Sequence, residues 1–176
     1  MSRTPDWLQE KLFERRIVFL TGRLDAALAA QVASQITMLD AAADRPIDVI
    51  VNSGDGTLDA AFVLIDVLDA TRSTVRAQCQ GQVAGPAVGV VAAADEGSAA
   101  PHTTFRLSAP PTELSGTPEQ IATRSAQHRE LLWRFQARLA HATGRAPEDV
   151  ADDMRRGRYL DAREALDYGL IDAIRV

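Results

Sequence analysis

The sequence predicts an α/β fold with a mainly parallel sheet. Three observations support this: short apolar runs that fit buried strands, longer Ala-rich or amphipathic segments that fit helices, and turn-forming residues between the two. Because strands and helices alternate, the pattern indicates stacked βαβ units. In folds of this kind, ligand-binding and catalytic groups gather at the carboxyl ends of the strands.

The first half of the chain is predicted to alternate between helices and apolar strands. In order, these are a short helix at 6–16, a strand at 17–20, a helix at 25–43, a strand at 47–51 and a helix at 58–70. Residues 52–56 read Asn-Ser-Gly-Asp-Gly, a run of turn-forming residues directly after the second strand. This turn is therefore one place where functional groups are expected.

The second half continues the alternation. The predicted elements are a strand at 74–79, a helix at 86–94, a strand at 103–107, a long helix at 118–142, short helices from Pro147 and from Asp161, and a strand at 170–174. Residues 81–85 are predicted to form a second turn, and Pro86 suits the first position of the helix after it. Asp161 and Glu164 have the spacing of a capping box.

Composition excludes several classes of protein. The 176 residues suit one domain, 1–176, and a net charge of −5 without a long basic run argues against nucleic-acid binding. No apolar stretch approaches the ~20 residues of a membrane helix. With a single cysteine, Cys79, and no signal-peptide pattern, a cytoplasmic protein is expected. The three histidines lack metal-ligand spacing, so neither a metal nor a cofactor is expected.

Both turns resemble motifs of ClpP, the proteolytic subunit of the Clp protease. Residues 52–56 resemble its Asn-Ser-Pro-Gly-Gly motif, and residues 81–87 (Gly-Gln-Val-Ala-Gly-Pro-Ala) resemble its Gly-Gln-Ala-Ala-Ser-Met-Gly segment. Residues 14–22 resemble the family's first strand, and 156–172 its C-terminal signature. The resemblance covers about residues 10–175. It implies a ClpP/crotonase-like fold, with an N-terminal segment and short helix over 1–16 and a handle region over 111–143 that contains the long helix.

The resemblance also implies where catalytic groups would stand. The nucleophilic serine of the family corresponds to Gly85, its histidine to Ser108 and its aspartate to Gly157; the two oxyanion N–H donors correspond to Gly56 and Pro86. A serine peptidase needs a nucleophile, a base, a group that orients the base, and oxyanion donors. Glycine offers no side chain and proline no N–H, so no catalytic residue is expected at these positions.

ClpP-like subunits form heptameric rings that pair, so the resemblance implies a homo- or hetero-oligomer. Asp48 and Ile50 stand where the family has aromatic docking residues, which argues against docking of a Clp ATPase on this subunit alone. The favoured function is that of a non-catalytic or regulatory ring subunit of a Clp-type proteolytic complex. Two alternatives remain: a hydrolase or acyl-CoA-type enzyme of the same superfamily, and a self-assembling scaffold without a protease partner.

Overall fold

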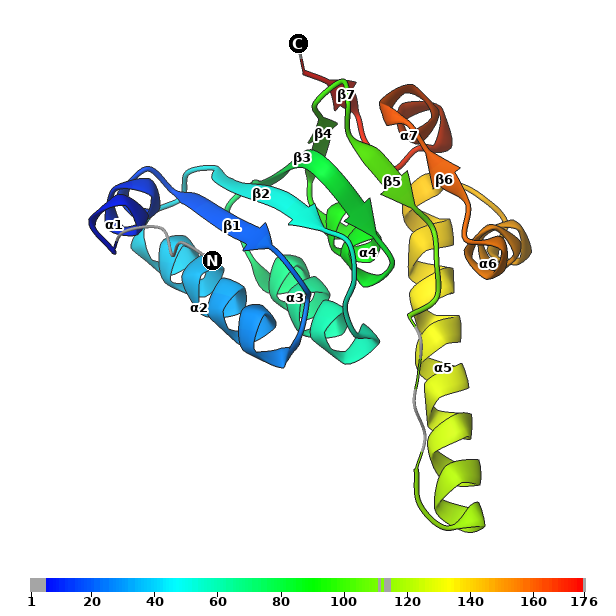
Figure 1. Cartoon of the computed structure of the whole chain (residues 1–176). Coiled ribbons are helices and arrows are strands. Elements are labelled where there is room, and N and C mark those ends of the chain that lie inside the picture. The colour runs from blue at the N-terminus through cyan, green and yellow to red at the C-terminus, as the bar shows by residue number, and fades with distance from the viewer. Residues whose placement is uncertain (1–5, 111, 113–114, 176) are drawn as a thin grey trace.

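A computed structural model describes residues 6–110, 112 and 115–175 of the chain. The N-terminal segment expected at residues 1–5 lies outside the described residues, as do 111, 113 and 114 of the expected handle region. Figure 1 shows a twisted sheet with helices packed beneath it and one long helix, α5, that extends away from the rest.

Helices and strands alternate through most of the chain. In chain order they are α1 (Asp6–Glu14), β1 (Ile17–Thr21), α2 (Ala26–Ala42), β2 (Ile47–Ser53), α3 (Leu58–Ala70), β3 (Val75–Ala84), α4 (Pro86–Ala93), β4 (Glu96–Ala99), β5 (Thr104–Arg106), α5 (Pro118–Thr143), α6 (Pro147–Arg156), β6 (Tyr159–Leu160), α7 (Ala162–Tyr168) and β7 (Ala173–Ile174). The α/β class predicted from the sequence is confirmed.

The sheet is mainly parallel, as predicted. Its strands follow the order β1-β2-β3-β4-β7, and every neighbouring pair in this path is parallel. β5 pairs in parallel with the end of β3, and β6 pairs antiparallel with β5. The sheet therefore has a second branch, and this branch begins where β3 ends.

The strands β3, β4, β6 and β7 differ from the sequence-based prediction. β3 was predicted to end at residue 79 and to be followed by a turn at 81–85, yet it continues to Ala84. It continues because its first part pairs with β4 and its last part, from Gln82, pairs with β5. β4 and β6 were not predicted, since neither has an apolar run, and β7 covers only Ala173–Ile174 of the predicted 170–174.

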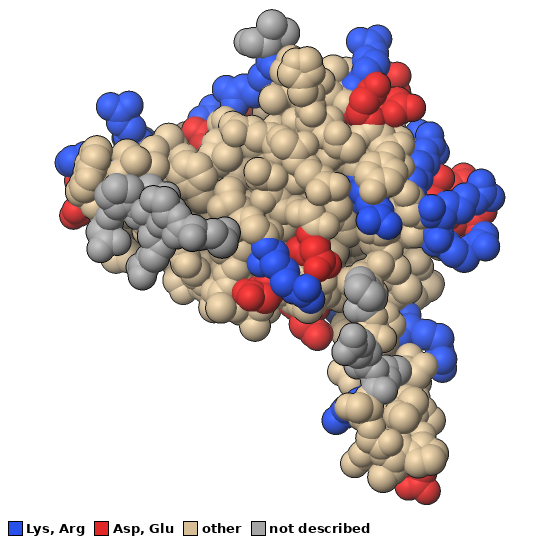
Figure 2. Space-filling view, in the orientation of Figure 1, with Lys and Arg blue, Asp and Glu red and all other residues tan. Residues whose placement is uncertain are grey.

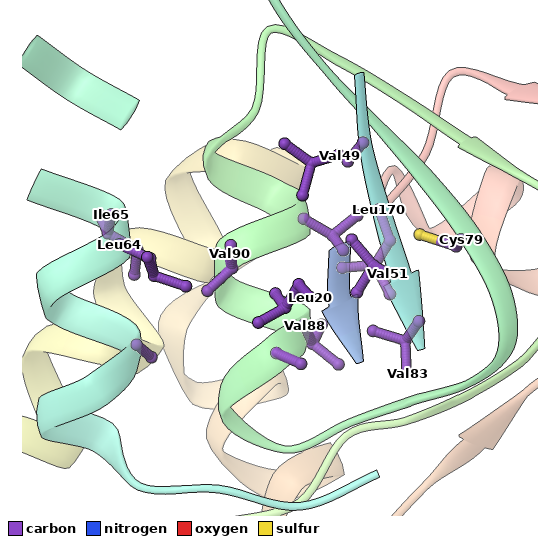
Figure 3. Packing of buried hydrophobic residues seen from close by; sticks show 14 of the residues in the cluster. Leu20, Val49, Val51, Leu64, Ile65, Cys79, Val83, Val88, Val90 and Leu170 are labelled. Atoms are coloured by element: carbon purple, nitrogen blue, oxygen red, sulfur yellow. The ribbon is translucent and has the colours of Figure 1, made fainter. Parts of the chain in front are cut away.

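One face of the sheet is buried against α2, α3 and α4 (Figure 1). Buried and less buried residues alternate along β1, β2 and the first part of β3, as expected for strands with one covered face. Figure 3 shows the packing: Val49, Val51 and Cys79 extend from the strands, and Leu64 and Val90 come from α3 and α4. The other face, which carries Asp48 and Arg76, is left open.

The long predicted helix is confirmed as α5. Thr117 caps it in a capping box with Gln120, and Gly144 ends it in the left-handed conformation. Its buried residues, among them Phe135, all lie in its second half. The Phe135 ring packs so closely on α4 that a Cβ at Gly89 would come within 2.2 Å of it. Among the described residues, no helix is long and apolar enough to cross a membrane.

Candidate functional site

The two turns singled out in the sequence follow adjacent parallel strands. Residues after Ser53 connect β2 to α3, and Gly85 connects β3 to α4. Because β2 and β3 are paired in parallel, their carboxyl ends lie at the same edge of the sheet. This edge is where α/β folds most often build their sites.

Gly85 forms a sharp strand-to-helix turn. Its φ of 55° and ψ of −123° are far more accessible to glycine than to other residues. Its N–H donates to the carbonyl of Arg106 at 3.0 Å, and its own carbonyl accepts from the N–H of Val88 at 3.1 Å. The buried Pro86 follows as the first residue of α4. The turn therefore presents neither a side chain at position 85 nor an N–H at position 86.

Ser108 lies directly beside Gly85. A Cβ built on Gly85 would be 3.5 Å from the carbonyl oxygen of Ser108 and 3.6 Å from its hydroxyl oxygen. Ser108 is half-buried, and its hydroxyl forms no hydrogen bond with any other described residue. Two positions that are 23 residues apart in the sequence are thus neighbours in space.

Gly157 ends α6 in the left-handed conformation, with φ of 66°. A Cβ built on Gly157 would lie 3.4 Å from the Nη2 atom of Arg106. Gly157 and Ser108 line one open cleft of about 580 Å³, together with Arg106 and residues of α5 and α6. The fold therefore brings the β3–α4 turn, the chain after β5 and the end of α6 together.

Gly56 lies in the first turn, and its N–H is already engaged. It donates to the Asp55 Oδ1 atom at 2.7 Å, while Asp55 Oδ2 forms an ion pair with Arg23 at 2.7 Å. A Cβ at position 56 would be 2.6 Å from the carbonyl oxygen of Leu24, so the close approach of that segment requires glycine here. The Asp55 carboxylate therefore occupies the N–H that the family resemblance assigns to an oxyanion.

Arg106 is a site residue that the sequence reasoning missed. It lies on β5 and its guanidinium stacks 5.3 Å from the centroid of the Tyr159 ring on β6. The available signal was its alternation with Ser108, because residues two apart on an extended chain share a face. This alternation does not place Arg106 in the site unless β5 is already known to lie beside the turn at Gly85.

Arg155 and Arg156 bring further positive charge to the cleft. Both donate to the carboxylate of Asp152, Arg156 at 2.8 Å. The hydrogen bond from Arg155, and then its charge, lower the pKa of Asp152 below its ordinary value. In Figure 2, basic and acidic side chains gather over the α6 and α7 side of the molecule. Because two arginines share one carboxylate, these three side chains together carry a net positive charge.

The open face of the sheet carries a second polar group. Arg76 donates to both oxygens of Asp48, at 2.8 and 3.0 Å, and Gln78 donates to the same carboxylate at 2.9 Å. The three residues stand on the adjacent strands β2 and β3. We call this group the Asp48 network.

The remaining chemistry-bearing side chains do not join either region. Cys79 of β3 is buried in the core, and burial raises the pKa of its thiol to about 12. His128 lies on α5, where its ring nitrogens are 3.0 and 3.2 Å from the Thr112 hydroxyl. Within the part of the chain that the structure describes, no group of His, Cys, Asp or Glu is arranged to hold a metal ion.

Comparison with known proteins finds one matching family and several similar chains. The family described as Clp protease matches residues 3–176. ATP-dependent Clp protease proteolytic subunit 1 of Corynebacterium diphtheriae is 32% identical, across 93% of this chain and 80% of its own length. Subunit 4 of Rhodococcus jostii is 31% identical, across 93% and 86%. A Clp protease proteolytic subunit-like protein of Streptomyces coelicolor is 36% identical, across 98% and 84%.

Proposed function

The chain belongs to the Clp protease family, and we propose that it is a non-catalytic subunit of a Clp-type proteolytic complex. The observation that carries the proposal is the β3–α4 turn. The position that corresponds to the family's nucleophile is Gly85, which has no side chain, and Pro86 supplies no N–H to an oxyanion. Without a nucleophile there is no covalent route to peptide hydrolysis.

The neighbouring positions support the same proposal. Ser108 stands where the family has its histidine, and a serine hydroxyl is no general base at neutral pH. Gly157 offers no carboxylate, and a Cβ built on it would lie 3.4 Å from the guanidinium of Arg106. The N–H of Gly56 is bound by Asp55. Each role in the triad and oxyanion hole is thus unfilled or occupied by another group.

The proposal includes assembly into a heptameric ring that can pair with a second ring, either alone or with active ClpP-like subunits. What supports it is the surface of α5: its first half is exposed, and Trp133 is 61% exposed although Phe135 beside it is buried. A helix with apolar groups on two faces has room for a second partner.

We further propose that no Clp ATPase docks on this subunit alone. The Asp48 network replaces the apolar pocket that the family resemblance implies on this face of the sheet, and the polar groups in it are already paired with one another. An apolar loop would gain little from contact with such a surface. The expected location of the subunit is the cytoplasm.

The test of inactivity is a fluorophosphonate probe together with a fluorogenic peptide. We expect neither labelling nor hydrolysis above a heat-denatured control. The proteolytic subunit of C. diphtheriae serves as the positive control under the same conditions. Labelling of any serine in the folded protein would overturn the proposal and would direct attention to an alternative hydrolase site.

Mass photometry distinguishes a ring subunit from a scaffold without a protease partner. The chain is measured alone and after mixing with a triad-bearing Clp subunit from the same host. A mixed particle supports the proposed function, whereas two unmixed populations favour the scaffold. Calorimetry with an acyl-CoA tests the alternative of an acyl-CoA-type enzyme. Such an enzyme would bind the thioester oxygen with two N–H donors, but Pro86 has no N–H and the N–H of Gly56 is bound by Asp55.

A further inference from the structure

The cleft beside Gly157 combines positive charge with an apolar wall. It has a volume of about 580 Å³ and lies between β5, α5 and α6. Its lining includes the polar residues Arg106 and Ser108, and the apolar residues Leu132 of α5 and Met154 of α6. We call it the Arg106 cleft.

Arg106 has no acceptor for its guanidinium among the described residues. It forms neither an ion pair nor a side-chain hydrogen bond there, and its one specific contact is the stack on Tyr159. This stack orients the guanidinium without neutralising its charge. An oriented guanidinium with free N–H groups is suited to bind a planar anion with two oxygens.

The other charges of the cleft reinforce that preference. Arg155 and Arg156 together have one carboxylate partner, Asp152, so the charged residues that line the cleft carry a net positive charge. The whole chain has a net charge of −5, so the cleft is positive on a protein that is acidic overall. An anion is therefore drawn to this place rather than to the surface in general.

Ser108 supplies a second free donor near the first. Arg106 and Ser108 are two residues apart on extended chain, about 6–7 Å between Cα atoms, and both line the cleft. Beside them, Gly85 leaves the space of a side chain empty next to the Ser108 hydroxyl. One guanidinium and one hydroxyl match a group of single negative charge, and the adjacent apolar wall matches a hydrocarbon side chain attached to it.

We propose that the Arg106 cleft binds the terminal carboxylate of a short peptide whose last residue is apolar. The inference rests on the proposed function, because a subunit that does not cut peptides can hold one that an active partner has released. The carboxylate accepts from Arg106 and Ser108, and the last side chain contacts Leu132 and Met154. No covalent step is involved.

The binding test compares two ligands that differ only in the terminal group. N-acetyl-Ala-Ala-Leu with a free carboxylate and its C-terminal amide are titrated into the full chain and observed by saturation-transfer NMR. We expect the acid to bind at least about tenfold more tightly than the amide, and added salt to weaken only the acid. Equal binding of acid and amide would overturn the proposal, as would equal binding of inorganic phosphate.

Arg106→Gln is the direct variant, and Arg163→Gln is its control. Arg163 is an exposed arginine on α7, outside the cleft, so its replacement changes the net charge by the same amount. We expect the Kd of the acid to rise at least about tenfold for Arg106→Gln and to stay within about twofold for Arg163→Gln. An unchanged Kd for Arg106→Gln would refute the assignment.

Position 157 offers a matched pair of variants. Gly157→Asp places a carboxylate within reach of the Arg106 guanidinium, where it competes with the ligand from within the chain. Gly157→Asn has nearly the same size, and asparagine and aspartate both occur in the left-handed conformation of this position. We expect binding to be lost in Gly157→Asp and retained in Gly157→Asn. If both variants, folded by circular dichroism, bind equally, the proposal fails.

These outcomes are independent of those that test the proposed function. Fluorophosphonate labelling reports a nucleophile whether or not a carboxylate binds, and the acid–amide difference reports the anion site whether or not the chain hydrolyses peptides. A labelled protein that still prefers the acid would contradict the proposed function alone. An unlabelled protein that ignores the carboxylate would contradict the further inference alone.

Discussion

The Asp48 network and the Arg106 cleft are two polar regions whose groups are satisfied to different degrees. In the network, one carboxylate accepts from Arg76 and Gln78, so the charges are paired within the chain. In the cleft, the Arg106 guanidinium and the Ser108 hydroxyl have no acceptor among the described residues. The polar groups of the Asp48 network are paired with one another, whereas the Arg106 cleft has two donors that are available to a ligand.

Under the proposed function, this difference represents two ways in which a family site can change. On the open face of the sheet, the expected docking positions carry polar residues that pair with one another. At the strand ends, two of the expected triad positions are the glycines Gly85 and Gly157, which have no side chains, and Arg106 next to them has no charged partner among the described residues. A paired network contributes to stability, whereas unpaired donors are available for a ligand. The predictions below test that distinction in order of decreasing effect.

The largest effect is expected from rebuilding the catalytic groups at the cleft. One variant carries Gly85→Ser, Ser108→His and Gly157→Asp, and a second adds Pro86→Ala. Because Pro86→Ala restores an N–H for the oxyanion, we expect the second to hydrolyse a fluorogenic peptide about 10²–10³-fold faster than the first. The control is the second variant with Gly85 retained, which should be inactive. Equal rates for the two rebuilt variants would refute the role assigned to Pro86.

Breaking the Asp48 network should cost stability. Asp48→Ala removes the acceptor shared by Arg76 and Gln78, and Asp48 is only partly exposed, with 21% of its side chain accessible. We expect the free energy of unfolding to fall by about 1–2 kcal/mol, measured by urea denaturation, after allowing for solvent screening. Asp48→Asn keeps the size and one acceptor and should lose less. A loss below about 0.5 kcal/mol would show that the network is not stabilising.

Removing the unpaired arginine should have a smaller effect on stability. Arg106→Gln loses the stack on Tyr159, worth about 0.5–1 kcal/mol at an exposed position, and also relieves repulsion from nearby arginines. The same urea experiment should therefore give a change below about 1 kcal/mol. A larger loss than that of Asp48→Ala would reverse the comparison, because Arg106 would then be a structural residue.

The smallest effect concerns the pH dependence of stability at the edge of the cleft. The pKa of Asp152 is lowered in the folded state, first by the hydrogen bond from Arg155. A carboxyl with a lowered pKa stabilises the fold above its unfolded pKa of about 3.9 and loses this contribution as the pH falls through the folded value. Asp152→Asn should thus melt slightly below the unmodified chain at neutral pH and together with it in strong acid. A difference that grows in acid would contradict this assignment.

Much of the fold could be predicted because local signals agree with the tertiary structure. The apolar run at 17–20 forms β1 at the edge of the sheet, with Val18 and Leu20 buried, and the predicted capping residue Asp161 lies at the start of α7. β4 could not be predicted, because Glu96–Ala99 has little strand character of its own. It is a strand because β3 and β7 supply its hydrogen bonds on both sides.

The candidate site could be predicted only in part for a similar reason. The positions Gly85, Ser108 and Gly157 followed from motif order, and the structure places the first beside the second and the last two in one cleft. Arg106 could not be found this way, because an arginine at a strand end is ordinarily a solvated surface residue. Its proposed role depends on the short distance between β5, which carries Arg106, and Gly157 at the end of α6. No local sequence pattern predicts that distance.

The extension of α5 beyond the sheet also affects the frictional drag on the molecule in solution (Figure 1). Its 26 residues span roughly 39 Å at ~1.5 Å per residue, and the first half has no buried residue. A free monomer of this shape has a higher frictional ratio than a sphere of equal mass and sediments more slowly. An assembly that encloses the helix would lose that excess drag, so sedimentation velocity measures directly whether the arm is free or covered.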